Sequence, residues 1–202
     1  MTSTGAPRGQ YAKGAAKREE ILQVALEVVG RVGTGGATVR EIAAAAGISP
    51  TGLMHHFGSK DELFAAVLEA RDRGDGSVLV AEAAAGEAVP LDRVQDALRS
   101  MLAHNVDVAG LIELYVTVLG EAIRPDHAAH EYATGRYVLV RREMAAMLRS
   151  AQAAGDLRAD LDTDVAGALL VAALDGLQQM WLYDRSLDMA EHVDALLESW
   201  RA

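Results

Sequence analysis

The segment at residues 38–60, TVREIAAAAGISPTGLMHHFGSK, contains closely spaced helix-start signals, and this spacing restricts the fold more than any other feature of the chain. Thr38 followed by Glu41 forms a capping box, in which each side chain satisfies a free backbone N–H of the first helical turn. Ser49 followed by Pro50 marks the next start, because serine caps a helix and proline tolerates its first position. Only short helices joined by a tight turn satisfy both signals.

A glycine marks the turn between these two helices. Gly47 lies where the chain must reverse, and glycine tolerates the positive φ that sharp turns require. Ala43 lies one helical turn earlier and is small enough for the second helix to cross the first closely. A second capping box, Ser59 with Glu62, starts a third helix. Two short helices around a glycine-containing turn predict a helix-turn-helix, a motif that many small helical domains contain.

The complete segment resembles the DNA-binding segment of the TetR family of transcriptional regulators. The family pattern joins T-x-x-x-I-A-x-x-A-G-[IV]-S to a recognition helix that ends in F-x-S-K-x-x-L. The matching positions are Thr38, Ile42, Ala43, Ala46, Gly47, Ile48, Ser49, Leu53, Phe57, Ser59, Lys60 and Leu63. The resemblance implies a homodimeric DNA-binding regulator, most often a repressor that a small-molecule effector releases from an operator with two half-sites.

The resemblance also implies which side chains contact DNA. A helix that enters the major groove presents its N-terminal side chains to base edges, and flanking residues bind phosphates. The expected DNA-binding residues are Thr38, Arg40, Ser49, Pro50, Thr51, Gly52, His55, His56 and Lys60. The family usually has tyrosines at the positions of Met54 and His56, and a methionine cannot donate a hydrogen bond to phosphate. For the two histidines, an ordinary polar surface stays an open alternative.

The net charge of −10 is unevenly distributed along the chain. Residues 1–60 contain seven Lys and Arg and four acidic residues, and subtracting their net +3 from −10 leaves −13 for the remainder. A basic face for a polyanion on an acidic body fits this asymmetry. The absence of cysteine excludes disulfides and thiolate metal sites. Without a signal-peptide core or a long apolar run, the sequence predicts a cytoplasmic protein.

Helical spacing of apolar residues continues to the end of the chain, without a strand pattern of useful length. The sequence therefore predicts an all-α fold with an N-terminal three-helix helix-turn-helix domain. From the resemblance, a larger antiparallel helical ligand-binding and dimerisation domain follows it. We expect a flexible arm at residues 1–15, the DNA-binding domain at 16–73 and the helical domain at 78–202. Glycines within residues 74–77 predict the joint between the domains.

The resemblance implies a ligand cavity among the middle helices. The expected lining residues are Met101, Leu102, Tyr115, Leu119, Tyr137, Met144, Met147, Gln178 and Trp181, with His104 or His127 as further polar contacts. Methionines and aromatic residues at helical spacing are also typical of an ordinary core. The sequence leaves both interpretations open.

A strongly apolar stripe near the C-terminus predicts a dimer interface. In the family, the two C-terminal helices pair with their symmetry mates, and such a four-helix bundle buries more apolar surface than a surface helix needs. The expected interface residues are Leu169, Ala173, Leu177, Val193, Leu196, Leu197 and Trp200. Small residues at Gly167, Ala172 and Gly176 would let helices approach closely. A core within one chain is the alternative interpretation.

Two other functions are alternatives to regulation by DNA binding, and the first is an enzyme. His127 and His130 lie three residues apart on a helix, a spacing that can chelate a metal, but no third ligand has a convincing spacing. No Glu-x-x-His pair of the di-iron bundle kind and no phosphate-binding glycine loop is present, so we expect neither an enzyme nor a metal or other cofactor. The second rival is a helical ligand-binding or protein-interaction module without DNA binding.

Overall fold

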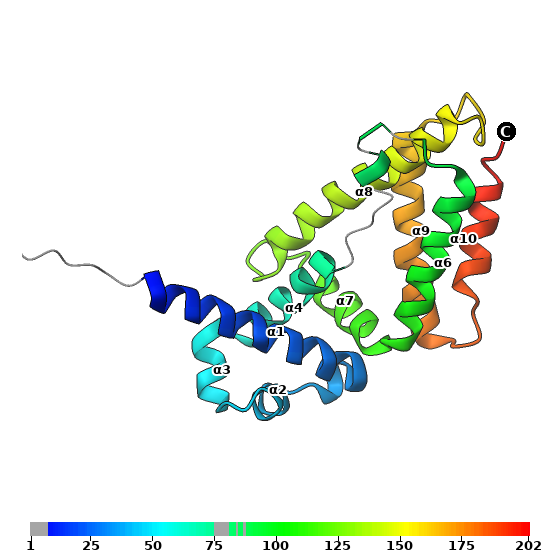
Figure 1. The fold of residues 1–202 in the computed structure, drawn as a ribbon. Coiled ribbons are helices and arrows are strands. Elements are labelled where there is room, and N and C mark those ends of the chain that lie inside the picture. Colours follow the sequence, from blue (N-terminus) through cyan, green and yellow to red (C-terminus); the bar gives the residue numbers. More distant parts are fainter. Residues whose placement is uncertain (1–7, 75–80, 84, 87) are drawn as a thin grey trace, which may run out of the picture.

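The computed structural model describes residues 8–74, 81–83, 85–86 and 88–202, and the regular structure in these residues is helical (Figure 1). The named helices are α1 (Arg8–Gly36), α2 (Val39–Ala45), α3 (Pro50–Phe57), α4 (Lys60–Gly74), α6 (Leu91–Asp107), α7 (Ala109–Glu121), α8 (His130–Ala153), α9 (Thr163–Tyr183) and α10 (Met189–Glu198). One isolated bridge pairs Leu157 with Arg201, and no strand occurs among the described residues. The predicted all-α class is confirmed.

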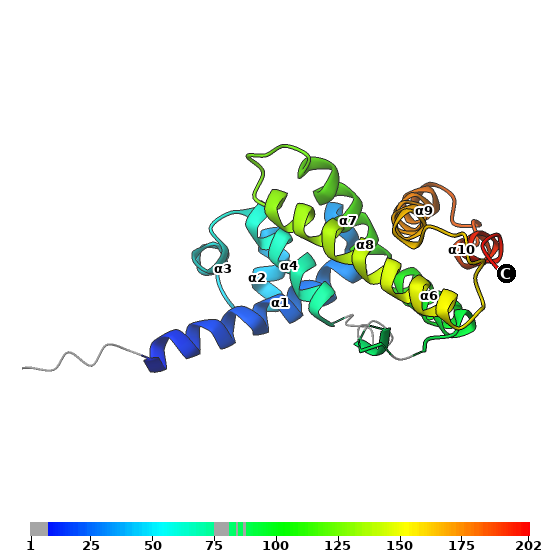
Figure 2. The ribbon, with the colours of Figure 1, turned by 90° about the horizontal axis from the view of Figure 1, so that it is seen from above.

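The helices form two lobes that share α7. Helices α1 to α4 make up the N-terminal lobe, at the lower left in Figure 1, and α6, α9 and α10 stand at the opposite end of the molecule. Helix α8 runs from the N-terminal lobe to the far end of α9, as Figure 2 shows from above. Helix α7 packs on both α1 and α9 and so connects the lobes.

The helix-start signals in the N-terminal lobe act as the sequence predicts. The Thr38 hydroxyl accepts a hydrogen bond from the Glu41 backbone N–H at 3.1 Å, and the Glu41 carboxylate accepts one from the Thr38 N–H at 2.9 Å. Ser49 accepts a hydrogen bond from the N–H of Gly52 at 3.0 Å. Gly47 has a φ of 67°, so the glycine is needed at the turn.

The start of the chain departs from the prediction. Helix α1 begins at Arg8, so residues 8–15, which we expected in a flexible arm, are helical. Residues 1–7 of the predicted arm and residues 75–77 of the predicted joint lie outside the described residues. At its other end α1 is interrupted at Gly33, whose φ of 65° is not helical. This interruption falls in the glycine-rich run of residues 33–36.

Helices α1 and α7 cross at backbone contact. A methyl group on Gly110 of α7 would overlap the carbonyl oxygen of Val29 and lie 2.9 Å from that of Gly30. Both oxygens belong to the α1 backbone, which cannot move aside as a flexible side chain can. Around this crossing, buried residues of α7 join the core of the N-terminal lobe, while Ile112 of α7 belongs to the core of the other lobe.

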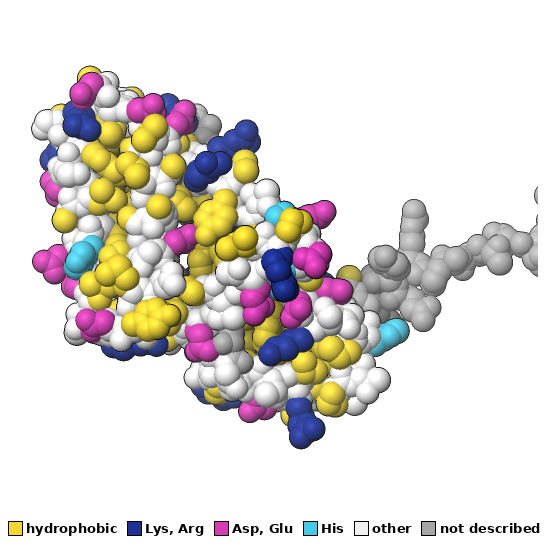
Figure 3. Space-filling model, turned by 180° about the vertical axis from the view of Figure 1, so that it is seen from behind, with side chains coloured by type: hydrophobic (Ala, Val, Ile, Leu, Met, Phe, Trp, Pro, Cys, Tyr) yellow, Lys and Arg dark blue, Asp and Glu magenta, His cyan; other side chains and the backbone are white. Residues whose placement is uncertain are grey.

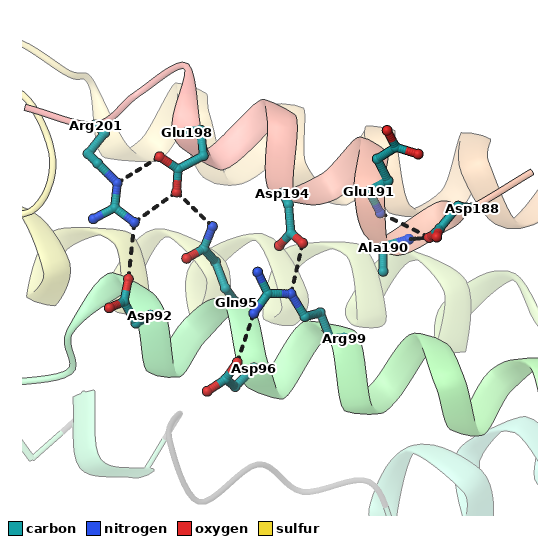
Figure 4. A network of polar contacts seen from close by, with 10 residues as sticks. All are labelled: Asp92, Gln95, Asp96, Arg99, Asp188, Ala190, Glu191, Asp194, Glu198 and Arg201. Carbon is teal, nitrogen blue, oxygen red and sulfur yellow. Dashed lines mark hydrogen bonds and ion pairs between the residues drawn. The ribbon is translucent and has the colours of Figure 1, made fainter.

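A network of charged side chains fastens α10 to α6 (Figure 4). Arg201 pairs with Asp92 at 3.0 Å and with Glu198 at 2.8 Å, and Gln95 donates to Glu198 at 3.0 Å. Hydrogen bonds from Arg201 and Gln95 lower the pKa of Glu198 to about 2. Nearby, Arg99 joins Asp96 and Asp194 at 2.8 Å each.

Replacing Gly110 with alanine should destabilise the fold. The added methyl group meets the α1 backbone, and such overpacking costs about 1–3 kcal/mol. Urea unfolding followed by circular dichroism measures the change. Gly120→Ala is the matched control on the same helix, because a methyl group there meets no atom within 4 Å among the described residues. Equal unfolding midpoints for the two variants would contradict the backbone contact.

The Glu198 network should make stability depend on pH in the acid range. A carboxyl group whose folded-state pKa is lowered stabilises the fold above its unfolded pKa, and this contribution disappears as the pH falls through the folded pKa. We expect Glu198→Gln to lower the thermal midpoint at neutral pH. The difference from wild type should shrink between the ordinary glutamate pKa of 4.5 and the folded-state value of about 2. Glu69→Gln, at an exposed position of α4, is the control, and a difference that is constant with pH would refute the assignment.

Candidate nucleic-acid interface and adjoining side-chain networks

Helix α3 has one buried face and one exposed face. Leu53 and Phe57 point into the N-terminal core, and Met54 packs partly against it. The opposite face presents the exposed Pro50, Thr51 and His55. Phe57 and Leu53 are therefore core residues, while the first turn of α3 is open to a partner. Met54, which stands where the family usually has tyrosine, belongs to the packed side.

Several predicted contact residues of α2 and α3 already make local hydrogen bonds. The Thr38 hydroxyl donates to Glu41 at 3.0 Å as well as accepting from its N–H, so its one hydrogen is committed to the capping box. These bonds from Thr38 hold the pKa of Glu41 below its ordinary value. Ser49 accepts from Gly52 but keeps its hydroxyl hydrogen for a partner. His55 and His56 lie edge to face, with ring centroids 6.2 Å apart.

Cationic side chains flank the exposed face of α3. The exposed Lys60 holds its ammonium group 5.1 Å above the ring of Phe64, and Arg40 is exposed on α2. Arg18 of α1 places its guanidinium 4.6 Å above the ring of Phe57, at the end of α3. The predicted contact residues omit Arg18. The sequence signal for Arg18 is its place in a basic pair with Lys17. Lys17 itself pairs with Glu20 at 2.8 Å.

The residues predicted to line a ligand cavity are divided between the two cores. Tyr115 and Leu119 belong to the N-terminal core. Leu102, Met147 and Trp181 lie in the core of α6, α9 and α10, as the partly buried Met101 and Met144 do, and Gln178 is buried. Tyr137 is 37% exposed. The described residues form pockets of about 660 and 300 Å³, and neither of these contains any of the nine side chains, although His127, the expected further polar contact, lines the smaller one. A common cavity for them stays a prediction.

A polar network joins α4 to α8. Asp72 of α4 accepts a hydrogen bond from the hydroxyl of Tyr132 at 2.7 Å and pairs with the guanidinium of Arg136 at 2.9 Å. Burial and the neighbouring Asp72 carboxylate raise the pKa of Tyr132, so its hydroxyl stays protonated and donates. Arg71, one residue earlier, donates to Asn105 of α6 at 2.7 Å. The last turns of α4 are therefore held by polar contacts to both α6 and α8.

The network continues from α8 to α7 and α9. The Arg136 guanidinium lies 4.8 Å above the ring of Tyr115, and the Tyr115 hydroxyl donates to Asp175 of α9 at 3.0 Å. Tyr137 donates to the other carboxylate oxygen of Asp175 at 2.8 Å. The structure thus brings together two of the predicted ligand residues, Tyr115 and Tyr137. It joins them to residues that the sequence did not single out, namely Asp72, Tyr132, Arg136 and Asp175.

The predicted dimer interface needs a correction. Leu177, Val193, Leu197 and Trp200 are buried within the core of the chain itself, so their side chains cannot form an exposed contact surface. Ala173 and Leu196 are half-buried. Of the seven residues, only Leu169 is exposed, with 53% of its surface accessible. For the buried residues, the alternative interpretation as a core within one chain is the correct one.

Another face of α9 is exposed and apolar. We call it the α9 stripe, and it consists of the exposed Val165, Leu169, Ala172, Met180 and Tyr183 and the half-buried Gly176. Hydrophobic side chains spread over the lobe at the left of Figure 3, where α9 lies. By length and composition α9 could cross a membrane, as could the bent pair α6 and α7 taken together, but core helices of soluble proteins pass the same test.

His127 and His130, whose spacing is that of a metal-binding pair, make contacts with the backbone. Nδ1 of His127 accepts from the N–H of Ala129 at 3.2 Å, and Nδ1 of His130 lies 2.8 Å from the carbonyl oxygen of Ala122. Within the described part of the chain, no group of three His, Cys, Asp or Glu side chains is placed to hold a metal ion.

Comparisons with known proteins agree with this geometry. Residues 21–67 match the model of the bacterial regulatory proteins of the tetR family. The HTH-type transcriptional repressor KstR2 of Rhodococcus jostii is 28% identical over 166 residues, which cover 74% of this chain and 72% of KstR2. The HTH-type transcriptional regulator BetI of Rhizobium meliloti is 36% identical over 85 residues, but this match spans only 41% of this chain and 40% of BetI.

A solved structure supports the same fold over nearly the whole chain. Thermus thermophilus FadR, a TetR-family transcriptional repressor in complex with lauroyl-CoA, has a TM-score of 0.63 to this chain. The two share 21% sequence identity, and the similarity covers 90% of this chain and 91% of FadR.

Proposed function

Because this chain belongs to the TetR family of bacterial regulatory proteins, we propose that it is a sequence-specific DNA-binding transcriptional repressor. A small-molecule effector releases it from its operator. The observation that carries this proposal is the exposed first turn of α3, flanked by the cationic Arg18, Arg40 and Lys60. Its relatives BetI and KstR2 are transcriptional regulators. In this proposal the protein acts in the cytoplasm, where its operator lies.

In this proposal α3 enters the major groove of operator DNA. Thr51 contacts base edges or a thymine methyl group, and Gly52 allows the backbone to approach closely. Ser49 donates its free hydroxyl hydrogen, and Pro50, His55 and His56 complete the surface that faces the groove. Lys60, Arg40 and the backbone near Thr38 bind phosphates, with Arg18 as an additional phosphate contact. Phosphate contacts supply affinity, and the base contacts of Thr51 supply sequence preference.

The active form in this proposal is a homodimer that pairs through the α9 stripe. Leu169, Val165 and Met180 supply apolar area, while Ala172 and Gly176 let the two α9 helices approach closely. A two-fold axis through this face places two α3 helices on the same side of DNA. The two α3 helices then bind two DNA half-sites that lie about one helical turn apart. The half-buried Ala173 and Leu196 lie at the margin of the contact.

The effector acts on the position of α4, whose last turns contact α6 and α8. FadR, a structural relative, binds lauroyl-CoA, and an effector of this protein binds among the helices of the C-terminal lobe. A ligand changes DNA affinity only by its differential affinity for the two conformations. The last turns of α4 are held by contacts of Asp72 with Tyr132 and Arg136, and of Arg71 with Asn105. In this proposal, a shift of α4 breaks these contacts. The hydrogen bonds that Tyr115 and Tyr137 donate to Asp175 extend this coupling to α9.

Fluorescence-anisotropy titration against a library of genomic promoter fragments tests DNA binding. We expect tight binding to a few fragments. Lys60→Ala should weaken binding to all fragments. The slope of log affinity against log salt concentration should fall in magnitude by about one, because one phosphate contact is lost. Thr51→Ala should re-rank the fragments. Arg158→Ala, far along the chain from α3, serves as the control for lost charge. Weak, unselective binding that neither substitution changes would favour a helical module without DNA binding.

The dimer is tested by light scattering on Leu169→Glu. A charge at the centre of the α9 stripe meets its own copy across the two-fold axis, so the variant should be monomeric at concentrations where wild type is dimeric. Its affinity for a two-half-site operator should fall by about tenfold or more, because binding loses the second recognition helix. Ile123→Glu is the control, since Ile123 is 78% exposed but lies outside the stripe. A dimeric Leu169→Glu variant would place the interface elsewhere.

A further inference from the structure

A pocket of about 300 Å³ opens beside Lys60, where the first turn of α4 meets α7 and the connection from α7 to α8. This volume is at the lower end of the range for small-molecule sites. Its charged and ring-bearing lining residues are Lys60, Asp61, Phe64, Glu113, Glu121 and His127. The pocket is separate from the proposed effector region of the C-terminal lobe.

His127 brings an unsatisfied hydrogen-bond donor to this pocket. Its side chain is only 3% exposed, and Nδ1 accepts a hydrogen bond from the Ala129 N–H. The ring hydrogen therefore sits on Nε2, which has no hydrogen-bond partner within the described residues. The nearest carboxylate oxygens belong to Glu121 at 3.6 Å and Asp61 at 3.9 Å, beyond hydrogen-bond length. Buried donors without an acceptor are rare, so the acceptor for Nε2 comes from a water or a bound molecule in the pocket.

The charges around this donor have both signs. Lys60 contributes an ammonium group over the Phe64 ring, while Asp61, Glu113 and Glu121 contribute three carboxylates. With His127 neutral, the lining carries a net charge of −2 from one Lys and three acidic side chains. A purely anionic ligand would be repelled by the carboxylates, and a simple cation would leave the Nε2 hydrogen without an acceptor. A ligand with a carboxylate and more than one ammonium group satisfies both requirements.

We propose that this pocket binds a cationic α-amino acid. The ligand carboxylate accepts hydrogen bonds from Nε2 of His127 and from the Lys60 ammonium group. Its ammonium groups face the carboxylates of Glu113, Glu121 and Asp61. A ligand of net charge +1 matches the net charge of the lining better than a neutral zwitterion does.

The position of Lys60 gives the site a regulatory consequence, which rests on the proposed function. Lys60 is assigned to a DNA phosphate, and a ligand carboxylate in the pocket engages the same ammonium group. Occupation of the pocket and binding of the operator therefore compete for one side chain. This competition differs from release through α4, because the ligand acts directly at the edge of the DNA-binding surface.

Isothermal titration calorimetry of the full chain without DNA tests the site. The probes are L-lysine, L-arginine, cadaverine, which lacks the carboxylate, and 6-aminohexanoate, which lacks the second ammonium group. We expect one site for lysine or arginine and about tenfold weaker binding of the two truncated probes. Equal binding of cadaverine would show a plain cation site and overturn the proposal. Absence of lysine and arginine binding at millimolar concentration would leave only water at His127 and would overturn it as well.

Two variants assign the binding to this pocket. Glu121→Gln changes an exposed residue at the pocket mouth, so the fold should persist while lysine binds about tenfold more weakly. Glu191→Gln on α10 lies outside the pocket and should bind lysine as wild type does. Binding that Glu121→Gln does not change would overturn the assignment.

A second titration, with labelled operator present, separates this inference from the proposed function. Lysine should weaken operator binding by wild type and have a smaller effect on Glu121→Gln. If lysine binds but leaves operator affinity unchanged, the competition through Lys60 is refuted. If no promoter fragment binds while calorimetry still shows the lysine site, the proposed repressor function fails and the amino-acid site stands.

Discussion

The contact between α1 and α7 at Gly110 is the constraint on which the rest of the arrangement depends. Because this crossing leaves no space for a side chain, α1 has one position relative to α7. Helix α2 packs on α1, and α3 packs on α2 and α4, so the exposed face of α3 is oriented by the same crossing through α2. Helix α4 is held differently, since its last turns contact α6 and α8 through the polar side chains of Arg71 and Asp72. Polar contacts of this kind can exchange partners, whereas the glycine crossing cannot.

The N-terminal lobe was predictable because its determinants are local. The capping box of Thr38 and Glu41, and the cap at Ser49, act within one helical turn of the residues that the sequence shows side by side. The start of α1 was missed for a related reason. Residues 8–15 lack the large apolar residues that define a helical face, but alanine and lysine favour helix, and a formed helix extends at little cost.

Contacts between distant helices could not be predicted in the same way. Helical spacing shows that Val193, Leu197 and Trp200 share a face, but not whether that face meets α6 of the same chain or a second copy. The cluster of Asp72, Arg136 and Asp175 assembles polar residues from α4, α8 and α9, and no spacing within one helix connects them. The unsatisfied Nε2 of His127 likewise appears only once burial and neighbours are known.

Helix α7 contributes side chains to both hydrophobic cores, and this sharing determines how the protein unfolds. Neither lobe has a complete core without α7, so separating the lobes would expose apolar surface on α1 and on α9 together. The chain should therefore melt as a single cooperative unit rather than as two independent domains. A fragment cut at residues 74–77 would keep α2 and α4 beside the recognition helix but would lose the α7 residues that cover α1 and α4.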